Sequence, residues 1–227
     1  MHKIGLYFGS FNPVHIGHLM IANYATEHFG LNEVHFVISP QNPFKEQKDL
    51  LDVNDRIELL EKALEHDGDG KIFYNPIELT LPQPSYTTNT LRKIKENDRI
   101  ELENNGLLND FKIEYSIIMG LDNFLTIDSW NDAEYILSHN IIVFPRIDKD
   151  GGNINELFDN QLNNLKEKFN IDLNVQYAIN APINNLSSTF IREEIKNNRS
   201  IRYYVTDNVL KLIKERNYYA KESSFNH

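Results

Sequence analysis

Residues 5–18 read GLYFGSFNPVHIGH, and the expected fold follows from this segment. An apolar run, Ile4 to Phe8, stops at Gly9-Ser10, and the chain then passes through Asn12-Pro13. Beyond the proline, two histidines stand three residues apart where a helical pattern begins. The sequence therefore predicts a strand, a tight turn and a helix start.

Such a turn suits a phosphate group. Gly9 lets the backbone approach a ligand closely, and the free N–H groups of a helix start attract anions. His15 and His18 fall on one face of the first helical turn and can point at the same oxygens. The pair could also be an ordinary surface pair or two metal ligands, but the chain has neither cysteine nor an HExxH spacing. We favour a phosphate site.

The rest of the chain alternates strand and helix patterns, which predicts an α/β fold with a doubly wound, mostly parallel sheet. Ligands in such sheets bind at the carboxyl ends of the strands, where the strand order reverses. We expect a single domain over residues 1–227, with a polar surface insertion around 97–112. Further strands are expected at 33–38, 72–75, 113–119, 140–144 and 173–179. Helices are expected at 19–29, 87–96, 132–137 and 158–169, and three more after the caps Asp52, Ser187 and Asp207, ending around 64–67, at 197 and near 216.

Composition narrows the classes of partner. The 33 acidic and 23 basic residues give a net charge of -10, which disfavours non-specific binding to nucleic acid or to a membrane surface. The chain has no cysteine, which fits a reducing compartment, and no apolar run approaches membrane-spanning length. We expect a cytoplasmic protein with no nucleic-acid or membrane partner, and a homo-oligomer is possible.

A second informative segment, Asn185 to Arg192, reads NLSSTFIR. Ser187, Ser188 and Thr189 at a helix start, with Arg192 one turn later, offer hydroxyls, backbone N–H groups and a guanidinium to one anion. Taken alone, a Ser-Ser-Thr run before a helix is by default a helix cap.

Together these segments resemble the nucleotidyltransferase superfamily, with HIGH as its (H/T)xGH motif and SSTFIR as its SxTxxR motif. Class I aminoacyl-tRNA synthetases also carry HIGH, but the chain lacks a KMSKS-type loop and has no room for a tRNA-binding domain. Two more segments, PSYTTNTL at 84–91 and MGLDNFLTIDSW at 119–130, resemble the nicotinate-nucleotide adenylyltransferases. The resemblance runs from Gly5 to about Tyr218 and implies a Rossmann-like fold.

The resemblance also implies roles for individual residues. The catalytic residues would be His15, His18, Lys45 and Arg192, which would supply positive charge, although Lys45 could equally be a solvated loop charge. Trp130 would cover the pyridine ring, where a single tryptophan is otherwise a core anchor, and the role of Arg146 is open because IDKD follows it instead of Pro-Gly. The ATP-binding residues would be Gly9, Ser10, Phe11, Gly120, Asp122, Ser187, Ser188 and Thr189, and those for nicotinate mononucleotide Ser85, Tyr86, Thr87, Trp130 and Arg146.

The implied reaction is adenylyl transfer from ATP to nicotinate mononucleotide, giving nicotinate adenine dinucleotide and pyrophosphate. The attacking phosphate oxygen is already ionised, so no general base is needed, and Mg²⁺ would be held mainly by the ATP phosphates rather than by a protein metal site. Two alternatives stay open. One is an adenylyltransferase acting on nicotinamide mononucleotide or another small phosphorylated substrate, and the other is a nucleotide-sensing module without turnover.

Overall fold

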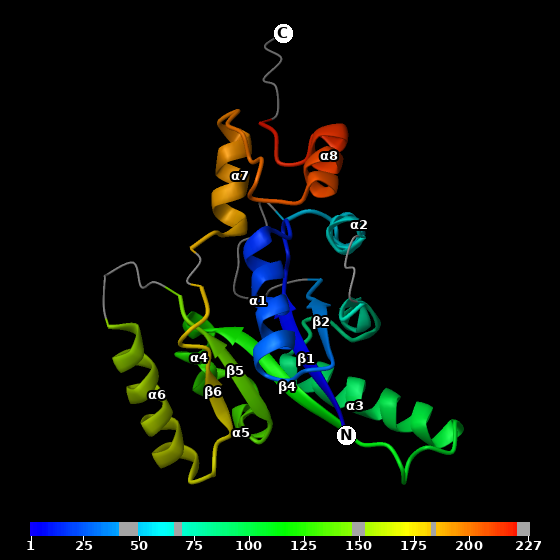
Figure 1. The fold of residues 1–227 in the computed structure, drawn as a ribbon, viewed down its shortest axis with the longest axis vertical. Coiled ribbons are helices and arrows are strands. Elements are labelled where there is room, and N and C mark those ends of the chain that lie inside the picture. Colours follow the sequence, from blue (N-terminus) through cyan, green and yellow to red (C-terminus); the bar gives the residue numbers. More distant parts are fainter. Residues whose placement is uncertain (41–49, 66–69, 147–152, 183–184, 222–227) are drawn as a thin grey trace.

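A single six-stranded sheet forms the centre of the protein, shown in Figure 1. The computed structural model describes residues 1–40, 50–65, 70–146, 153–182 and 185–221. Its strand order is β3-β2-β1-β4-β5-β6, and every neighbouring pair is parallel. The strands are β1 (His2–Gly9), β2 (Glu33–Ile38), β3 (Ile72–Asn75), β4 (Ile113–Gly120), β5 (Asn140–Phe144) and β6 (Val175–Tyr177).

The two central strands are buried on both faces, as expected for a parallel sheet that is covered by helices. The middle of β1 is buried over four consecutive residues from Ile4, and β4 is buried from Tyr115 to Met119. Side chains of successive residues point to opposite faces, so these apolar runs supply a hydrophobic core on each side. The predicted doubly wound α/β sheet is confirmed.

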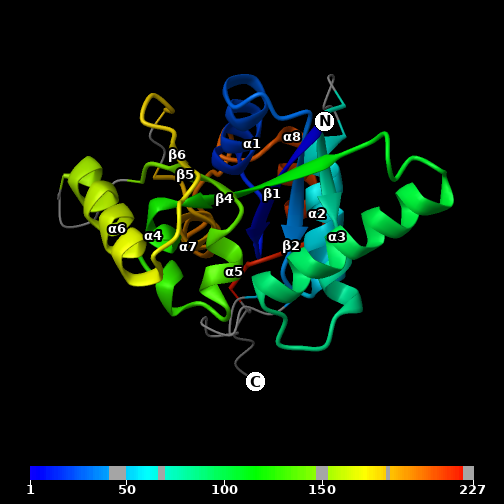
Figure 2. The ribbon, with the colours of Figure 1, turned by 90° about the horizontal axis from the view of Figure 1, so that it is seen from below.

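Helices cover both faces of this sheet, and Figure 2 shows α1 and α5 on opposite sides of it. One core contains residues of the first, second, seventh and eighth helices, and the other contains residues of the third to sixth. The helices are α1 (Ile16–His28), α2 (Val53–Leu64), α3 (Thr87–Asn104), α4 (Leu121–Phe124), α5 (Ala133–Leu137), α6 (Ile154–Phe169), α7 (Ser188–Lys196) and α8 (Asp207–Arg216), with 3₁₀ turns η2 (Ile77–Thr80) and η3 (Ile127–Ser129).

Several predicted boundaries differ from the structure, and three of the differences have a clear physical reason. Helix α3 continues to Asn104 instead of ending at Glu96, because its charged second half includes the helix formers Arg99, Glu101 and Leu102, and Arg99 pairs with Glu103 at 3.1 Å. Strand β6, at the sheet edge, covers only the centre of the expected run. Helix α8 is capped by Thr206 rather than by Asp207, since the Thr206 hydroxyl accepts from the N–H of Val209.

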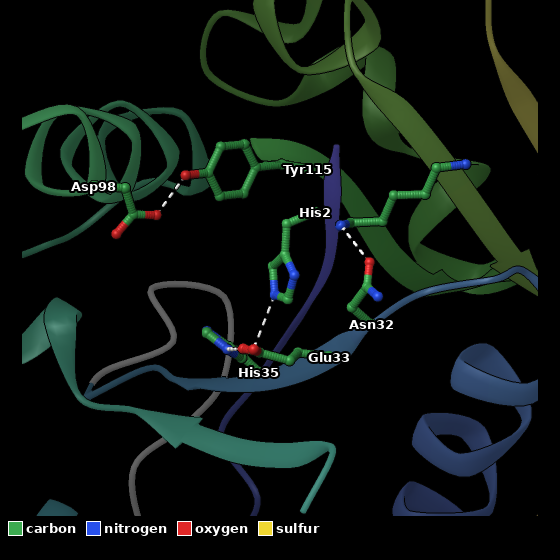
Figure 3. A network of polar contacts seen from close by, with 7 residues as sticks. His2, Asn32, Glu33, His35, Asp98 and Tyr115 are labelled. Carbon is green, nitrogen blue, oxygen red and sulfur yellow. Dashed lines mark hydrogen bonds and ion pairs between the residues drawn. The ribbon is translucent and has the colours of Figure 1, made fainter. Parts of the chain in front are cut away.

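The strand order reverses between β1 and β4, which are neighbours in the sheet although β2 and β3 lie between them in sequence. The carboxyl ends of both strands carry glycine, Gly9 and Gly120. At the opposite end of the sheet, the Glu33 carboxylate pairs with the Nε2 atoms of His2 at 2.9 Å and of His35 at 2.8 Å (Figure 3). The turn after β1, predicted as a phosphate site, therefore lies at the reversal point. It is at the other end of the sheet from His2 and His35.

No helix within the described residues is both long and apolar enough to cross a membrane.

Candidate active site

A cavity of about 510 Å³ lies at the carboxyl ends of β1 and β4. Its wall combines the turn after β1, the start of α1, the residues after β4 and β5, and the start of α7. Most of the predicted site residues line it, although they come from opposite ends of the sequence. They are Gly9, Ser10, Phe11, His15, His18, Gly120, Asp122, Arg146, Ser187, Ser188, Thr189 and Arg192.

The turn after β1 is closely packed. A Cβ atom at Gly9 would lie 2.9 Å from the Phe11 ring, so only glycine fits there. Phe11 itself has a positive φ of 45°, and its ring packs edge-on against Phe36 and His18. Because the ring is only 2% exposed, it belongs to the core. Phe11 was predicted to pass beside the nucleotide, and its backbone is the part available to do so.

The two histidines lie face to face at the start of α1, with ring centroids 3.6 Å apart. The backbone N–H of His15 donates to Nδ1 of His18 at 3.2 Å, so a neutral His18 carries its proton on Nε2. Burial, reinforced by the nearby charge of Arg146, lowers the pKa of His15 to about 3. His15 is therefore neutral near pH 7, and the positive charge expected on it from the sequence is absent from the free protein.

The start of α7 is joined to the turn after β1 by hydrogen bonds. The Ser188 hydroxyl donates to the carbonyl oxygen of Pro13 at 2.9 Å, and Nη1 of Arg192 donates to that of Asn12 at 2.9 Å. Ser187 is the helix cap, accepting from the N–H of Phe190 at 3.1 Å. The two motifs expected to share one anion are thus in contact, and the Ser188 proton already bonds to the backbone.

Asn12 was not singled out from the sequence, yet it joins several segments around the cavity. Its side-chain Oδ1 accepts from the Tyr219 hydroxyl at 2.7 Å and from the N–H of Leu51 at 3.2 Å. The segment after α8 and the segment before α2 therefore both contact the turn. Its position beside Pro13 was the only available signal, since asparagine before proline indicates a turn.

On the other side of the cavity, Arg146 and Asp122 form an ion pair of 2.8 Å. A Cβ atom at Gly120 would lie 2.5 Å from Oδ1 of Asp122, so glycine leaves space for this carboxylate. Arg146 was predicted on the pyridine side. In the free protein its partner is the residue predicted to bind ATP, and both line the same cavity, so the pyridine-side role of Arg146 stays a prediction.

The four other residues predicted to enclose the pyridine ring, Ser85, Tyr86, Thr87 and Trp130, do not line this cavity. They do lie near one another, because the Thr88 hydroxyl donates to the carbonyl oxygen of Asn131 at 2.7 Å. Tyr86, which precedes α3, is exposed. Lys45 lies outside the described residues.

A buried carboxylate behind this segment was missed. Glu78 is 2% exposed and accepts hydrogen bonds from the hydroxyls of Ser85 and Thr90, each at 2.9 Å, and from Ser39. Burial raises the pKa of Glu78, although these bonds act against the shift. The single hydroxyl proton of Ser85 is thus directed at Glu78 rather than at a ligand. No sequence pattern distinguishes Glu78 from a solvated charge between Ile77 and Leu79.

Comparison with known proteins agrees with this architecture. A family profile described as cytidylyltransferase-like matches residues 6–194. A protein of Flavobacterium psychrophilum named "probable nicotinate-nucleotide adenylyltransferase" is 41% identical over 96% of this chain and 100% of its own length. The chain belongs to the nicotinate-nucleotide adenylyltransferase family.

Other relatives agree with this assignment to the nicotinate-nucleotide adenylyltransferases, which are nucleotidyltransferases. The Bacteroides fragilis protein with the same name is 37% identical, over 93% of this chain and 90% of its own. A solved structure, Plasmodium falciparum nicotinic acid mononucleotide adenylyltransferase complexed with NaAD, superposes with a TM-score of 0.71. It covers 96% of this chain and 98% of the other, and at 17% identity it supports the Rossmann-like fold.

Proposed function

We propose that this protein transfers the adenylyl group of ATP to nicotinate mononucleotide, forming nicotinate adenine dinucleotide and pyrophosphate in NAD biosynthesis. The observation that carries the proposal is the joining of the (H/T)xGH and SxTxxR segments around one cavity, through Arg192 and Ser188. The full-length similarity to enzymes of that name supports the choice of substrates.

The reaction requires the protein mainly to position the two substrates and to stabilise negative charge on the phosphates. The phosphate oxygen of the mononucleotide attacks the α-phosphorus of ATP, and pyrophosphate leaves with the bonding electrons. Nε2–H of His18 and the Nη groups of Arg192 are suited to donate to the α-phosphate and the leaving group, where negative charge grows. His15 enters the reaction neutral, and a phosphate brought next to it would raise its pKa and favour a shared proton.

The nucleotidyltransferase family points to a divalent metal ion. Among the described residues, no group of three or more histidine, cysteine, aspartate or glutamate side chains could hold one. Asp122, the carboxylate predicted on the ATP side, is already paired with Arg146. We propose Mg²⁺ as this ion, bound mainly through the phosphates of ATP and water, where it would neutralise phosphate charge.

The pyridine side of the proposal rests on the segment around Tyr86 and Trp130. Because these residues lie outside the cavity of the free protein, a mononucleotide bound there would extend from the phosphate turn towards α3. Ser85 is assigned a supporting role, through Glu78, rather than ligand contact. The backbone N–H groups at the start of α3 are the donors that suit a ring carboxylate. Cytoplasmic location and oligomeric state stay predictions.

Pyrophosphate release from ATP across a panel of mononucleotides tests the proposal. Release with nicotinate mononucleotide, with nicotinate adenine dinucleotide as the co-product, is the expected result. Faster release with nicotinamide mononucleotide would identify the protein as an adenylyltransferase for the amide substrate. Binding of ATP with no release for any acceptor would identify the sensing module instead.

A further inference from the structure

Arg56, in α2, is the largest fully buried side chain among the described residues, and it is a cation. Its Nη1 donates to the carbonyl oxygens of Ser10 at 2.7 Å and Ser39 at 2.8 Å, and its Nη2 to that of Pro40 at 2.7 Å. Its Nε donates to the carbonyl oxygen of Leu51 at 3.0 Å. No carboxylate in the described part of the chain forms an ion pair with it. A buried guanidinium is rare, so its four backbone partners need an explanation.

These partners belong to loops around the cavity. Ser10 is in the turn after β1, and Ser39 and Pro40 follow β2 and lead into the segment that contains Lys45. The N–H of Ser39 also donates to the carbonyl oxygen of Gly9 at 2.9 Å. The guanidinium thus fixes the two loops to one another from behind, without entering the cavity itself.

The bond to Ser10 sets the direction of one peptide group. The Ser10–Phe11 peptide is trans, so its N–H points opposite to its C=O. With the Ser10 oxygen held by Arg56, the Phe11 N–H points away from Arg56, and Phe11 lines the cavity. Phe11 also has φ of 45°, a conformation that residues with a Cβ adopt only when their surroundings impose it.

We infer that Arg56 is a positioning residue that holds the Ser10 carbonyl out of the phosphate site, so that the turn presents the Phe11 N–H to ATP. This rests on the proposed function for the identity of the bound phosphates. Without the guanidinium, the Ser10 oxygen is free to rotate towards the cavity, where it would repel a phosphate and withdraw the N–H donor. A lysine keeps the charge but lacks the planar fork that reaches several carbonyls at once.

The test compares Arg56→Lys with Leu60→Ala, a buried residue one turn later in α2 that does not line the cavity. Both variants are assayed below their melting transitions, by calorimetric titration with ATP and by kcat. For Arg56→Lys we expect an ATP Kd raised about tenfold and a kcat lowered by ~10-fold or more, since small misplacements of reacting groups are costly. Leu60→Ala should lose stability while keeping both values within about twofold of wild type.

An ATP Kd for Arg56→Lys equal to that of Leu60→Ala would overturn the inference. If Arg56→Lys does not fold, an NMR titration of the wild-type protein labelled with ¹⁵N-phenylalanine replaces it. We expect the Phe11 amide resonance to shift when ATP is added. An unchanged resonance would overturn the inference. The ATP Kd and the Phe11 amide resonance both report ATP binding and do not depend on turnover. A wild type that binds ATP but makes no dinucleotide would therefore refute the proposed function while leaving Arg56 testable.

Discussion

Nη1 of Arg192 donates to the carbonyl oxygen of Asn12 at 2.9 Å, across 180 residues of sequence. The same guanidinium contacts the Thr189 hydroxyl at 3.3 Å through Nη2. Because one nitrogen is committed to the backbone of the phosphate turn, Arg192 both shapes the turn and presents a cation to the cavity that the turn encloses. Its planar fork allows these two tasks at once.

Replacing Arg192 by lysine should separate charge from geometry. Arg192→Lys keeps the cation but loses the fork, so we expect kcat/KM to fall by an amount equivalent to ~1–3 kcal/mol. Arg199→Lys is the matched control, because Arg199 is exposed and pairs with Glu194. Steady-state kinetics of both variants measure kcat/KM. Equal kcat/KM values for Arg192→Lys and wild type would show that the planar guanidinium is not needed.

His18 is expected to act on the transition state. His18→Ala should lower kcat by ~10²-fold or more and change ATP affinity much less, because its Nε2–H meets charge that grows during the reaction. His28→Ala, on the exposed face of the same helix, serves as the control. Near-normal turnover in His18→Ala would remove this residue from the mechanism.

Burial of His15 should make stability depend on pH. Its folded pKa of about 3 lies below the ordinary value of 6.5, so between these values the unfolded chain binds the proton more readily. Unfolding free energy should therefore fall as the pH drops through this window, by about 2 kcal/mol between pH ~7 and ~5 from this group. Urea unfolding of wild type and His15→Gln checks this, and parallel pH dependences of the two proteins would contradict it.

We expect a higher kcat/KM with nicotinate mononucleotide, which carries a carboxylate on the pyridine ring, than with nicotinamide mononucleotide, which carries an amide there. A ring carboxylate accepts from the N–H groups at the start of α3, whereas the amide NH₂ would face them and leave unpaired polar atoms. Mismatches of this kind discriminate by up to ~10⁴–10⁵ in kcat/KM. Comparing the two mononucleotides measures this preference, and equal values would refute the nicotinate assignment while leaving adenylyl transfer standing.

Trp130→Ala complements that comparison. If the indole covers the ring, the KM for nicotinate mononucleotide should rise about tenfold or more while ATP binding is retained, because stacking on the ring face is lost. Trp130 lies next to Asn131, whose carbonyl oxygen is bound by Thr88, so a matched Thr88→Val variant reports the effect of loosening that contact alone. An unchanged KM in Trp130→Ala would assign Trp130 to the core.

Periodicity predicted the central strands well because burial on both faces leaves continuous apolar runs. The predicted β2, β3 and β5 match the structure to the residue, although the edge strand β3 contains no buried residue. Most of the residues predicted from motifs line the cavity, because both motif segments are local in sequence, but they make up fewer than half of its lining residues. Arg56 and Glu78 could not be predicted, since a polar residue in an amphipathic pattern is assigned to solvent by default. Only the tertiary structure shows that both side chains are buried and that hydrogen-bond partners surround them, backbone carbonyl oxygens for Arg56 and hydroxyl groups for Glu78.

The bond between the Tyr219 hydroxyl and Oδ1 of Asn12 has a consequence for synthesis of the protein on the ribosome. Asn12 leaves the ribosome early, whereas Ser188, Arg192 and Tyr219 leave it near the end of synthesis. During most of translation the turn after β1 therefore lacks these hydrogen-bond partners. Contacts so distant in sequence form late and slowly in folding. If the proposed ATP site needs these partners, we expect a nascent chain to bind nucleotide only after its C-terminal segment has been made and has folded onto the turn.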